Sequence, residues 1–224
     1  MLFCNYSPTW FLGFDSILET LFILITLMIA GYAYRVYRFT GGKQFKRWAV
    51  GFLLISAAYL IQAITNFAIY QELVENTASP FIYQFLEVNR LYNIGLILHI
   101  VLFLSGYLLL MLVSLRIEDK RLIPLFAALI LVTALGSIPF PPLFETVVGL
   151  ILVYLIASTA QHHKGGRKTV SNGLVIAGFS VVLLGQLAYI FITVWNVSYA
   201  LGHVLEFIGY CALATSMIVI MRKR

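Results

Sequence analysis

Apolar residues are concentrated in seven stretches of the chain, and short segments that hold most of the charged residues separate them. The stretches cover roughly residues 14–36, 48–70, 91–115, 122–138, 143–161, 171–194 and 201–221. A helix needs about 20 mostly apolar residues to cross the hydrocarbon core of a bilayer. The pattern therefore predicts an all-α, seven-transmembrane helix bundle.

The composition agrees with a membrane location. Of the 224 residues, 61% are hydrophobic and 11% are charged, whereas about a quarter of the residues in soluble domains are charged. The seven stretches and their connections take up almost the whole chain, so we expect one transmembrane domain over residues 1–224. The sequence has no nucleophile, phosphate-loop or zinc-protease motif. We interpret it as a non-enzymatic, multi-pass protein of the cell membrane, with the lipid bilayer as its main partner.

The basic residues indicate how the chain is oriented. All but one of the 15 Lys and Arg residues fall on one side of the predicted membrane, and Arg90 is the exception. Short loops that are rich in Lys and Arg remain in the cytoplasm. The N-terminus is therefore expected outside and the C-terminus in the cytoplasm. Because topology explains the net charge of +6, no nucleic-acid partner is expected.

Two parts of the chain resemble each other in a way that predicts an internal repeat. The first and fifth stretches both carry Glu-Thr near their outer end, at Glu19 and Glu145, and a Gly-Gly pair follows each stretch. Gln62 and Gln186 follow these glycine pairs at the same interval. We predict a 3+1+3 arrangement, with parallel three-helix units over residues 14–115 and 143–221 and a linker helix over 122–138.

Polar residues inside the predicted helices are the candidates for function. A polar group without a partner costs several kcal/mol in hydrocarbon, so such residues should face the bundle interior. We predict that eight of them line a ligand-binding pocket open to the outside: His99, Glu206, His203, Asn66, Gln62, Gln186, Tyr189 and Tyr210. The repeat aligns His99 with Glu206, and we expect these two to face each other or a shared cavity. Glu19 and Glu145 are expected to reach water at the outer interface.

The same residues leave other interpretations open. Polar side chains in membrane helices often serve to join neighbouring helices, through hydrogen bonds worth about 0.6 kcal/mol each. His203 and Glu206 lie one helical turn apart and could bind a metal ion together with His99. His99 and His203 could also hold a haem. The sequence requires no cofactor, and whether one is bound stays unknown.

The last stretch carries a partial family resemblance. It reads GHVLEFIGYCALATSMIVIMRK, with His203 at its outer end and Gly209-Tyr210 further in. In these positions it resembles the closing helix of the seven-span sensor regions that precede bacterial and archaeal histidine kinases. Separately, the three-one-three arrangement is similar to that of the SWEET sugar transporters and the wider opsin-like bundles, although the Pro-Gln motif of the related PQ-loop proteins is absent. The first resemblance implies sensing, and the second implies transport.

We interpret the chain as a ligand- or ion-sensing module with an outward-facing polar pocket. Binding near His99, His203 and Glu206 would favour one helix arrangement, and a cytoplasmic or membrane signalling partner would receive the change. The alternatives are a small-solute transporter that uses the repeat and a metal- or haem-binding redox protein. The sequence leaves the ligand, the partner and the oligomeric state open.

Overall fold

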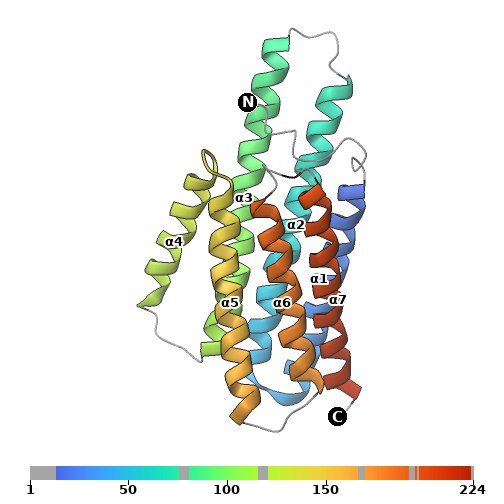
Figure 1. Ribbon diagram of the computed structural model, residues 1–224, viewed down its shortest axis with the longest axis vertical. Helices are drawn as coiled ribbons and strands as arrows, with labels where there is room; N and C mark the ends of the chain where they lie inside the picture. The colour runs from blue at the N-terminus through green and yellow to red at the C-terminus, as the bar shows by residue number, and fades with distance from the viewer. Residues whose placement is uncertain are drawn as a thin grey trace.

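The computed structural model describes residues 14–75, 81–115, 121–165, 170–191, 195 and 197–222, and the secondary structure in these ranges is helical (Figure 1). The all-α prediction is confirmed for this part of the chain. The helices are α1 (Phe14–Thr40), α2 (Lys43–Glu75), α3 (Phe81–Leu115), α4 (Leu122–Ser137), α5 (Pro142–Gly165), α6 (Val170–Ile190) and α7 (Val197–Arg222).

Six of these helices, all but α4, are long and apolar enough to cross a membrane. The fourth, α4, is also apolar but has 16 residues. At 1.5 Å per residue it is about 24 Å long, which is shorter than a hydrocarbon core of about 30 Å. The structure therefore supports a multi-pass membrane protein with six candidate spans and a shorter apolar helix between the third and the fourth of them.

Most helices extend beyond the boundaries that hydropathy suggested, whereas α6 ends at Ile190, before the expected residue 194. The sequence placed a connection over residues 71–90, but α2 continues to Glu75 and α3 already begins at Phe81. Hydropathy shows where the chain leaves the lipid. A helix can continue beyond that point, and it ends where a residue adopts a non-helical backbone conformation. Gly41 adopts such a conformation between α1 and α2, with a positive φ of 65° and an N–H that donates to the carbonyl of Tyr37 at 2.8 Å. Glycine adopts this conformation without steric cost.

Consecutive helices run in alternating directions, and six of them form a closed ring (Figure 1). Around the ring in the described part of the chain, α1 packs on α2, α2 on α3, α3 on α5, α5 on α6, α6 on α7, and α7 on α1. Helix α4 lies outside the ring and packs on α3 and α5. The helices α1–α3 and α5–α7 thus have matching directions and matching neighbours.

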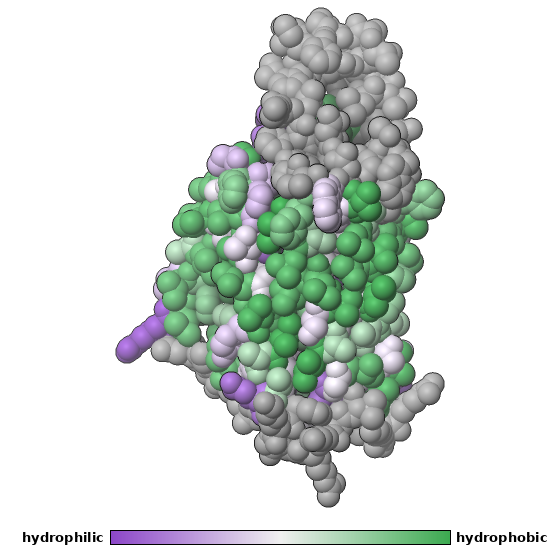
Figure 2. Space-filling view, viewed as in Figure 1, coloured by the Kyte–Doolittle hydropathy of each residue, from purple (hydrophilic) through white to green (hydrophobic). Residues whose placement is uncertain are grey.

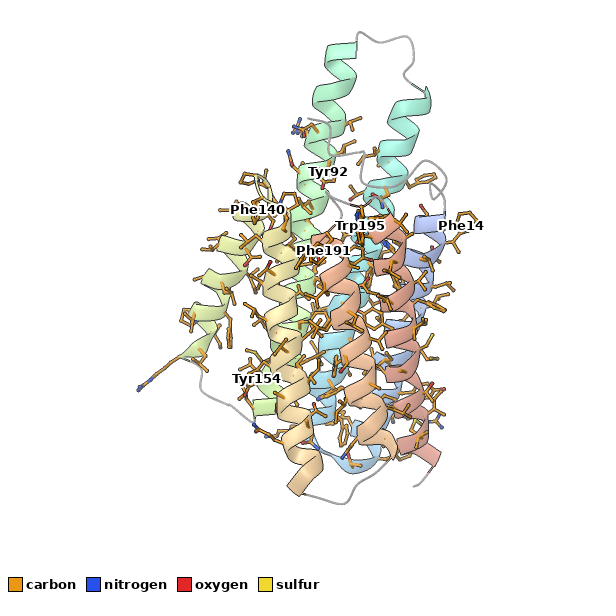
Figure 3. All side chains as sticks on the ribbon, in the orientation of Figure 1. Phe14, Tyr92, Phe140, Tyr154, Phe191 and Trp195 are labelled. Carbon is orange, nitrogen blue, oxygen red and sulfur yellow. The ribbon has the colours of Figure 1, made fainter. Side chains whose placement is uncertain are left out.

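The outer surface of the bundle is apolar, as a lipid-facing surface should be. Figure 2 shows a broad hydrophobic band over the face that carries α4 to α7. Leu131, Val132 and Leu150 are 59%, 65% and 66% exposed. In Figure 3, Phe140 and Trp195 lie near the end of the bundle where α5 and α7 begin, and aromatic side chains of this kind gather at membrane interfaces.

At the opposite end, α1, α3, α5 and α7 end, and α2, α4 and α6 begin (Figure 1). Basic residues occupy the described helix ends there: Arg35, Arg38, Lys43, Lys46, Arg47 and Arg121. We refer to this end as the basic end of the bundle. Arg90 lies in the first half of α3, towards the other end.

Glycines allow two pairs of helices to touch through their backbones. Helices α2 and α3 meet at Gly51 and Gly106, where a Cβ on Gly106 would lie 2.7 Å from the carbonyl oxygen of Gly51. Helices α6 and α7 meet at Gly178 and Gly209, where a Cβ on Gly209 would lie 2.8 Å from the carbonyl oxygen of Gly178. Small residues at such crossings allow close packing of membrane helices.

These contacts predict a local effect on stability. The methyl group introduced by Gly209→Ala would lie 2.5 Å from Cγ2 of Val182 and 2.8 Å from the Gly178 carbonyl. Overpacking of this kind costs about 1–3 kcal/mol, so we expect a clearly lower thermal unfolding temperature in detergent. Gly173→Ala on α6 is the matched control, because a Cβ there would meet nothing within 4 Å. Equal melting of the two variants would contradict the contact.

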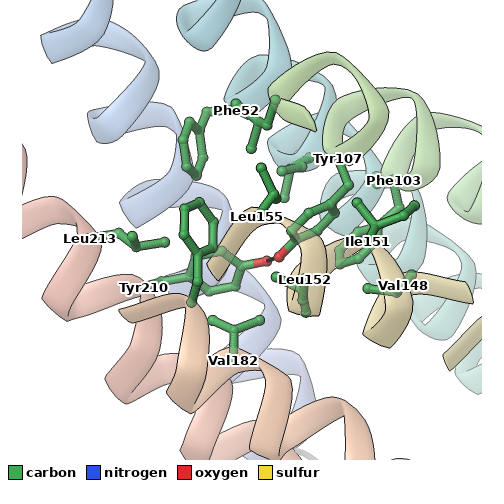
Figure 4. Close-up of a cluster of buried hydrophobic side chains, with 14 of the residues drawn as sticks. Phe52, Phe103, Tyr107, Val148, Ile151, Leu152, Leu155, Val182, Tyr210 and Leu213 are labelled. Carbon is green, nitrogen blue, oxygen red and sulfur yellow. Dashed lines mark hydrogen bonds between the residues drawn. The ribbon is translucent and has the colours of Figure 1, made fainter. Parts of the chain in front are cut away.

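A buried core fills the ring (Figure 4). Tyr107 of α3 and Tyr210 of α7 are both 0% exposed, and their hydroxyl oxygens lie 3.0 Å apart. Aliphatic and aromatic side chains enclose this pair, among them Phe52, Phe103, Val148, Ile151, Leu152, Leu155, Val182 and Leu213. The tyrosine pair links the two halves of the ring at its centre. The polar site described next ends at this pair.

Candidate functional site

Glu206 is the centre of a buried polar cluster. It lies on α7 and is 3% exposed. Gln186 of α6 donates its Nε2–H to one carboxylate oxygen. Tyr59 of α2 and Tyr189 of α6 donate their hydroxyls to the other oxygen, at 3.3 and 3.1 Å. One acidic side chain therefore joins three helices, and the three groups that bond it are neutral.

Further hydrogen bonds extend from both sides of this carboxylate. The hydroxyl of Tyr189 lies 2.8 Å from Nδ1 of His203, which in turn lies 3.1 Å from the carbonyl oxygen of Tyr199. The hydroxyl of Tyr59 lies 3.1 Å from that of Tyr210, which contacts Tyr107. We call the connected set the Glu206 network: His203, Tyr189, Gln186, Glu206, Tyr59, Tyr210 and Tyr107.

Tyr189 and Tyr59 each have one hydroxyl proton and two possible acceptors. Tyr189 can donate to Glu206 or to Nδ1 of His203, and Tyr59 can donate to Glu206 or to Tyr210. A charged Glu206 is the stronger acceptor for both hydroxyls, and a protonated or cation-bound Glu206 competes less well with their other partners. A change of charge at this carboxylate therefore changes hydrogen bonds towards both ends of the network.

Helical spacing and glycines explain why these side chains meet. His203, Glu206 and Tyr210 lie on one face of α7, and Tyr189 stands one turn after Gln186 on α6. A Cβ on Gly202 would lie 2.5 Å from the Tyr189 ring. The missing side chain at Gly202 therefore makes the space in which the Tyr189 ring reaches His203 and Glu206.

Of the eight site residues predicted from the sequence, five belong to the network: Gln186, Tyr189, His203, Glu206 and Tyr210. Tyr59 and Tyr107 were not among the predicted residues. Tyr59 shares the polar face of α2 with Ser56 and Asn66, and that spacing could have indicated it. Tyr107 stands among apolar residues in α3, and its sequence context gives no such signal.

His99 is buried beside the network. It is 8% exposed, its Nδ1 lies 3.0 Å from the carbonyl oxygen of Ala58, and its ring stacks on Phe103 with centroids 5.2 Å apart. Its ring also lies 6.1 Å from the ring of Tyr59, centroid to centroid. Tyr59 thus contacts both His99 and Glu206, and the described hydrogen bonds do not join these two directly.

The remaining predicted residues lie elsewhere on α2. Asn66 donates its Nδ2–H to Oε1 of Glu19 at 2.7 Å, which connects α2 to α1. Gln62 is half-buried and lies outside the network. The expectation that Glu19 reaches water is wrong, because its side chain is 0% exposed. The helix face that Glu19 shares with the buried Phe22 turns it towards the bundle interior.

One carboxylate oxygen of Glu145 is also turned inward. The residue is half-buried, and its Oε2 is buried. It interacts electrostatically with Glu206 and with Tyr189. Together with Glu206, it brings a second carboxylate from α5 to the same region of the bundle.

Among the described residues, no three His, Cys, Asp or Glu side chains come together as a metal ion would require. The combination of His99, His203 and Glu206 therefore has no support as a metal site in this part of the chain. No protein-family model, curated protein or solved structure matches the chain.

Proposed function

We propose that this chain is a membrane-embedded ion- or ligand-sensing module whose central binding group is Glu206. The observation that carries the proposal is the position of this carboxylate, buried in an apolar bundle and bonded by neutral donors from two other helices. An ionisable residue inside a membrane bundle is expensive to bury and typically serves an ion or ligand pathway. A proton or a small cation neutralises it directly.

The network suggests how binding is passed on. Glu206 holds α7 to α2 through Tyr59 and to α6 through Gln186 and Tyr189. Neutralisation weakens these charge-assisted bonds and favours a different packing of α7 against its neighbours. Because α7 ends at the basic end of the bundle, a signalling partner on that side could detect the change.

The basic end is proposed to face the cytoplasm, which places the N-terminus outside and Glu206 nearer the outer surface. Glu206 lies about 14 Å along α7 from the first residue of that helix. In intact cells, a tag fused after Arg224 should resist added protease, and a tag before Met1 should be cleaved. The reverse pattern would invert the orientation and place the site nearer the cytoplasm. Lysed cells, in which both tags are accessible, provide the control.

We further infer that α1–α3 and α5–α7 are parallel repeats joined by α4. The matching ring neighbours and the two glycine crossings support this inference. Tyr107 directly follows Gly106 and Tyr210 directly follows Gly209, so the central tyrosine pair stands at equivalent places in the two halves.

The sequence aligned Gln186 with Gln62 and Glu206 with His99. Aligning the two halves by their glycine crossings gives a different match. Tyr59 follows Gly51 at the interval at which Gln186 follows Gly178, so Gln186 matches Tyr59 in place of Gln62. By the same alignment Glu206 matches Phe103, and the polar site has no acidic counterpart in the first half.

Transport is the second candidate function, and the repeat favours it. Transporters built from parallel repeats bind their substrates between the halves, and Glu206 of one half is bonded by Tyr59 of the other. Solute and ion flux in proteoliposomes, compared between wild type and Glu206→Gln, separates the two functions. Sensing predicts hydrogen-exchange changes along α7 when pH or cation is varied, without flux. Flux that Glu206→Gln abolishes would establish transport.

A further inference from the structure

A second carboxylate, on a different helix, interacts electrostatically with Glu206. Glu145 lies in the first turn of α5, and α5 packs beside α6, which supplies Gln186 and Tyr189. Glu145 interacts electrostatically with Glu206 and with Tyr189. Its Oε2 is buried and accepts no hydrogen bond in the described part of the chain.

The amide of Gln186 also has a buried atom without a partner, and it bonds Glu206. Gln186 is 2% exposed, and its Nε2–H is committed to Glu206. Its other amide atom, Oε1, is buried and has no hydrogen-bond partner among the described residues. Two acceptor oxygens from α5 and α6 therefore lack donors beside a carboxylate on α7. A buried acceptor without a donor is costly, and a bound positive charge would satisfy both.

The charges in this region lead to the same conclusion. Two carboxylates ionised together in an apolar interior repel each other, and the groups that bond Glu206 are neutral. The titratable groups around Glu206 come from the neighbouring helices. They are Tyr59 of α2, His99 and Tyr107 of α3, Glu145 of α5, Tyr189 of α6, and His203 and Tyr210 of α7. On α1, Glu19 is also buried.

We propose that Glu145 and Glu206, with the amide oxygen of Gln186, bind one positive charge between them, as a proton or as a monovalent cation. All three groups offer oxygen ligands, which suit a hard cation such as Na⁺. When a proton binds, one O–H bond forms on a carboxylate oxygen, and the other carboxylate keeps its charge. This proposal rests on the proposed role of Glu206 and adds a second ligand residue and the class of ligand.

The test uses the full-length protein in lipid nanodiscs and counts protons with a soluble pH indicator. After an acid pulse, wild type should take up about one proton per chain more than Glu145→Gln, Glu206→Gln or the double variant. Because the charge is shared, either single variant should lose as much uptake as the double variant. Glu145→Asp should retain uptake, and Glu19→Gln should behave like wild type.

A second arm adds Na⁺ at constant ionic strength, with N-methylglucamine as the replaced cation. Release of a proton on Na⁺ addition, absent in Glu145→Gln, identifies a site that monovalent cations share with protons. Uptake without such release identifies a proton site. If Glu145→Gln keeps the full uptake and only Glu206→Gln loses it, the shared site is wrong and the role of Glu206 stands. If neither variant changes uptake, both proposals fail.

Discussion

Replacing Glu206 by glutamine should abolish the response of the bundle to the ion or ligand that it senses. Glutamine keeps the shape of the side chain and can still accept from Tyr59 or Tyr189, but it carries no charge. We expect the apparent affinity for the sensed cation to fall by about 100-fold or more, equivalent to roughly 3 kcal/mol. Hydrogen exchange along α7, followed as pH or cation concentration is varied, would measure the loss.

Two conservative variants should give graded effects in the same assay. Tyr189→Phe removes the hydroxyl that Glu206 and His203 share, and Tyr59→Phe removes the one that Glu206 and Tyr210 share. Each should weaken the response by about 10-fold, because a hydrogen bond to a charged group contributes about 1.5–3 kcal/mol. Cys211→Ala, on the same helix and half-buried, is the control that should respond like wild type. If Glu206→Gln also responds like wild type, Glu206 is a structural residue.

Truncating Tyr210 should cause the largest loss of stability in the bundle. The side chain is 0% exposed, bonds the hydroxyls of Tyr59 and Tyr107, and packs on the ring of Phe22 with centroids 5.9 Å apart. Removing a large aromatic side chain from a core costs about 3–5 kcal/mol, so Tyr210→Ala should lower the free energy of unfolding by about that amount.

Comparison variants separate the lost volume from the lost hydroxyl. Tyr210→Phe keeps the ring and should cost about 1–2 kcal/mol, because two buried hydroxyls lose a partner. Tyr154→Ala, at a side chain that is 39% exposed, should change stability by no more than about 0.5 kcal/mol. Unfolding titrations in mixed detergent measure all three. Equal losses for Tyr210→Ala and Tyr154→Ala would show that the central tyrosine pair does not hold the ring together.

Helix-level features could be predicted from the sequence because each is a property of one segment. Hydropathy located all seven helices, and the spacing of His203, Glu206 and Tyr210 identified the polar face of α7. Helix ends were less predictable, as α2 shows, because the helix continues after its hydropathy falls.

Contacts between helices depend on how each helix is rotated in the ring, and no single segment encodes that rotation. The bond from Tyr59 to Tyr210 and the burial of Glu19 against Asn66 arise in this way. The role of Gly202 is of the same kind, because the ring of Tyr189 on the neighbouring helix occupies the space that a side chain there would fill.

The most direct test of the central claim is infrared difference spectroscopy on the protein in nanodiscs, between alkaline and acid conditions. Our account predicts a carboxylic acid C=O band that appears on acidification, is absent in Glu206→Gln and is retained in Glu19→Gln. The network also predicts accompanying tyrosine bands that change in Tyr59→Phe and Tyr189→Phe. An unchanged carboxylic acid band in Glu206→Gln would contradict the account, because Glu206 would then not be a group that takes up charge.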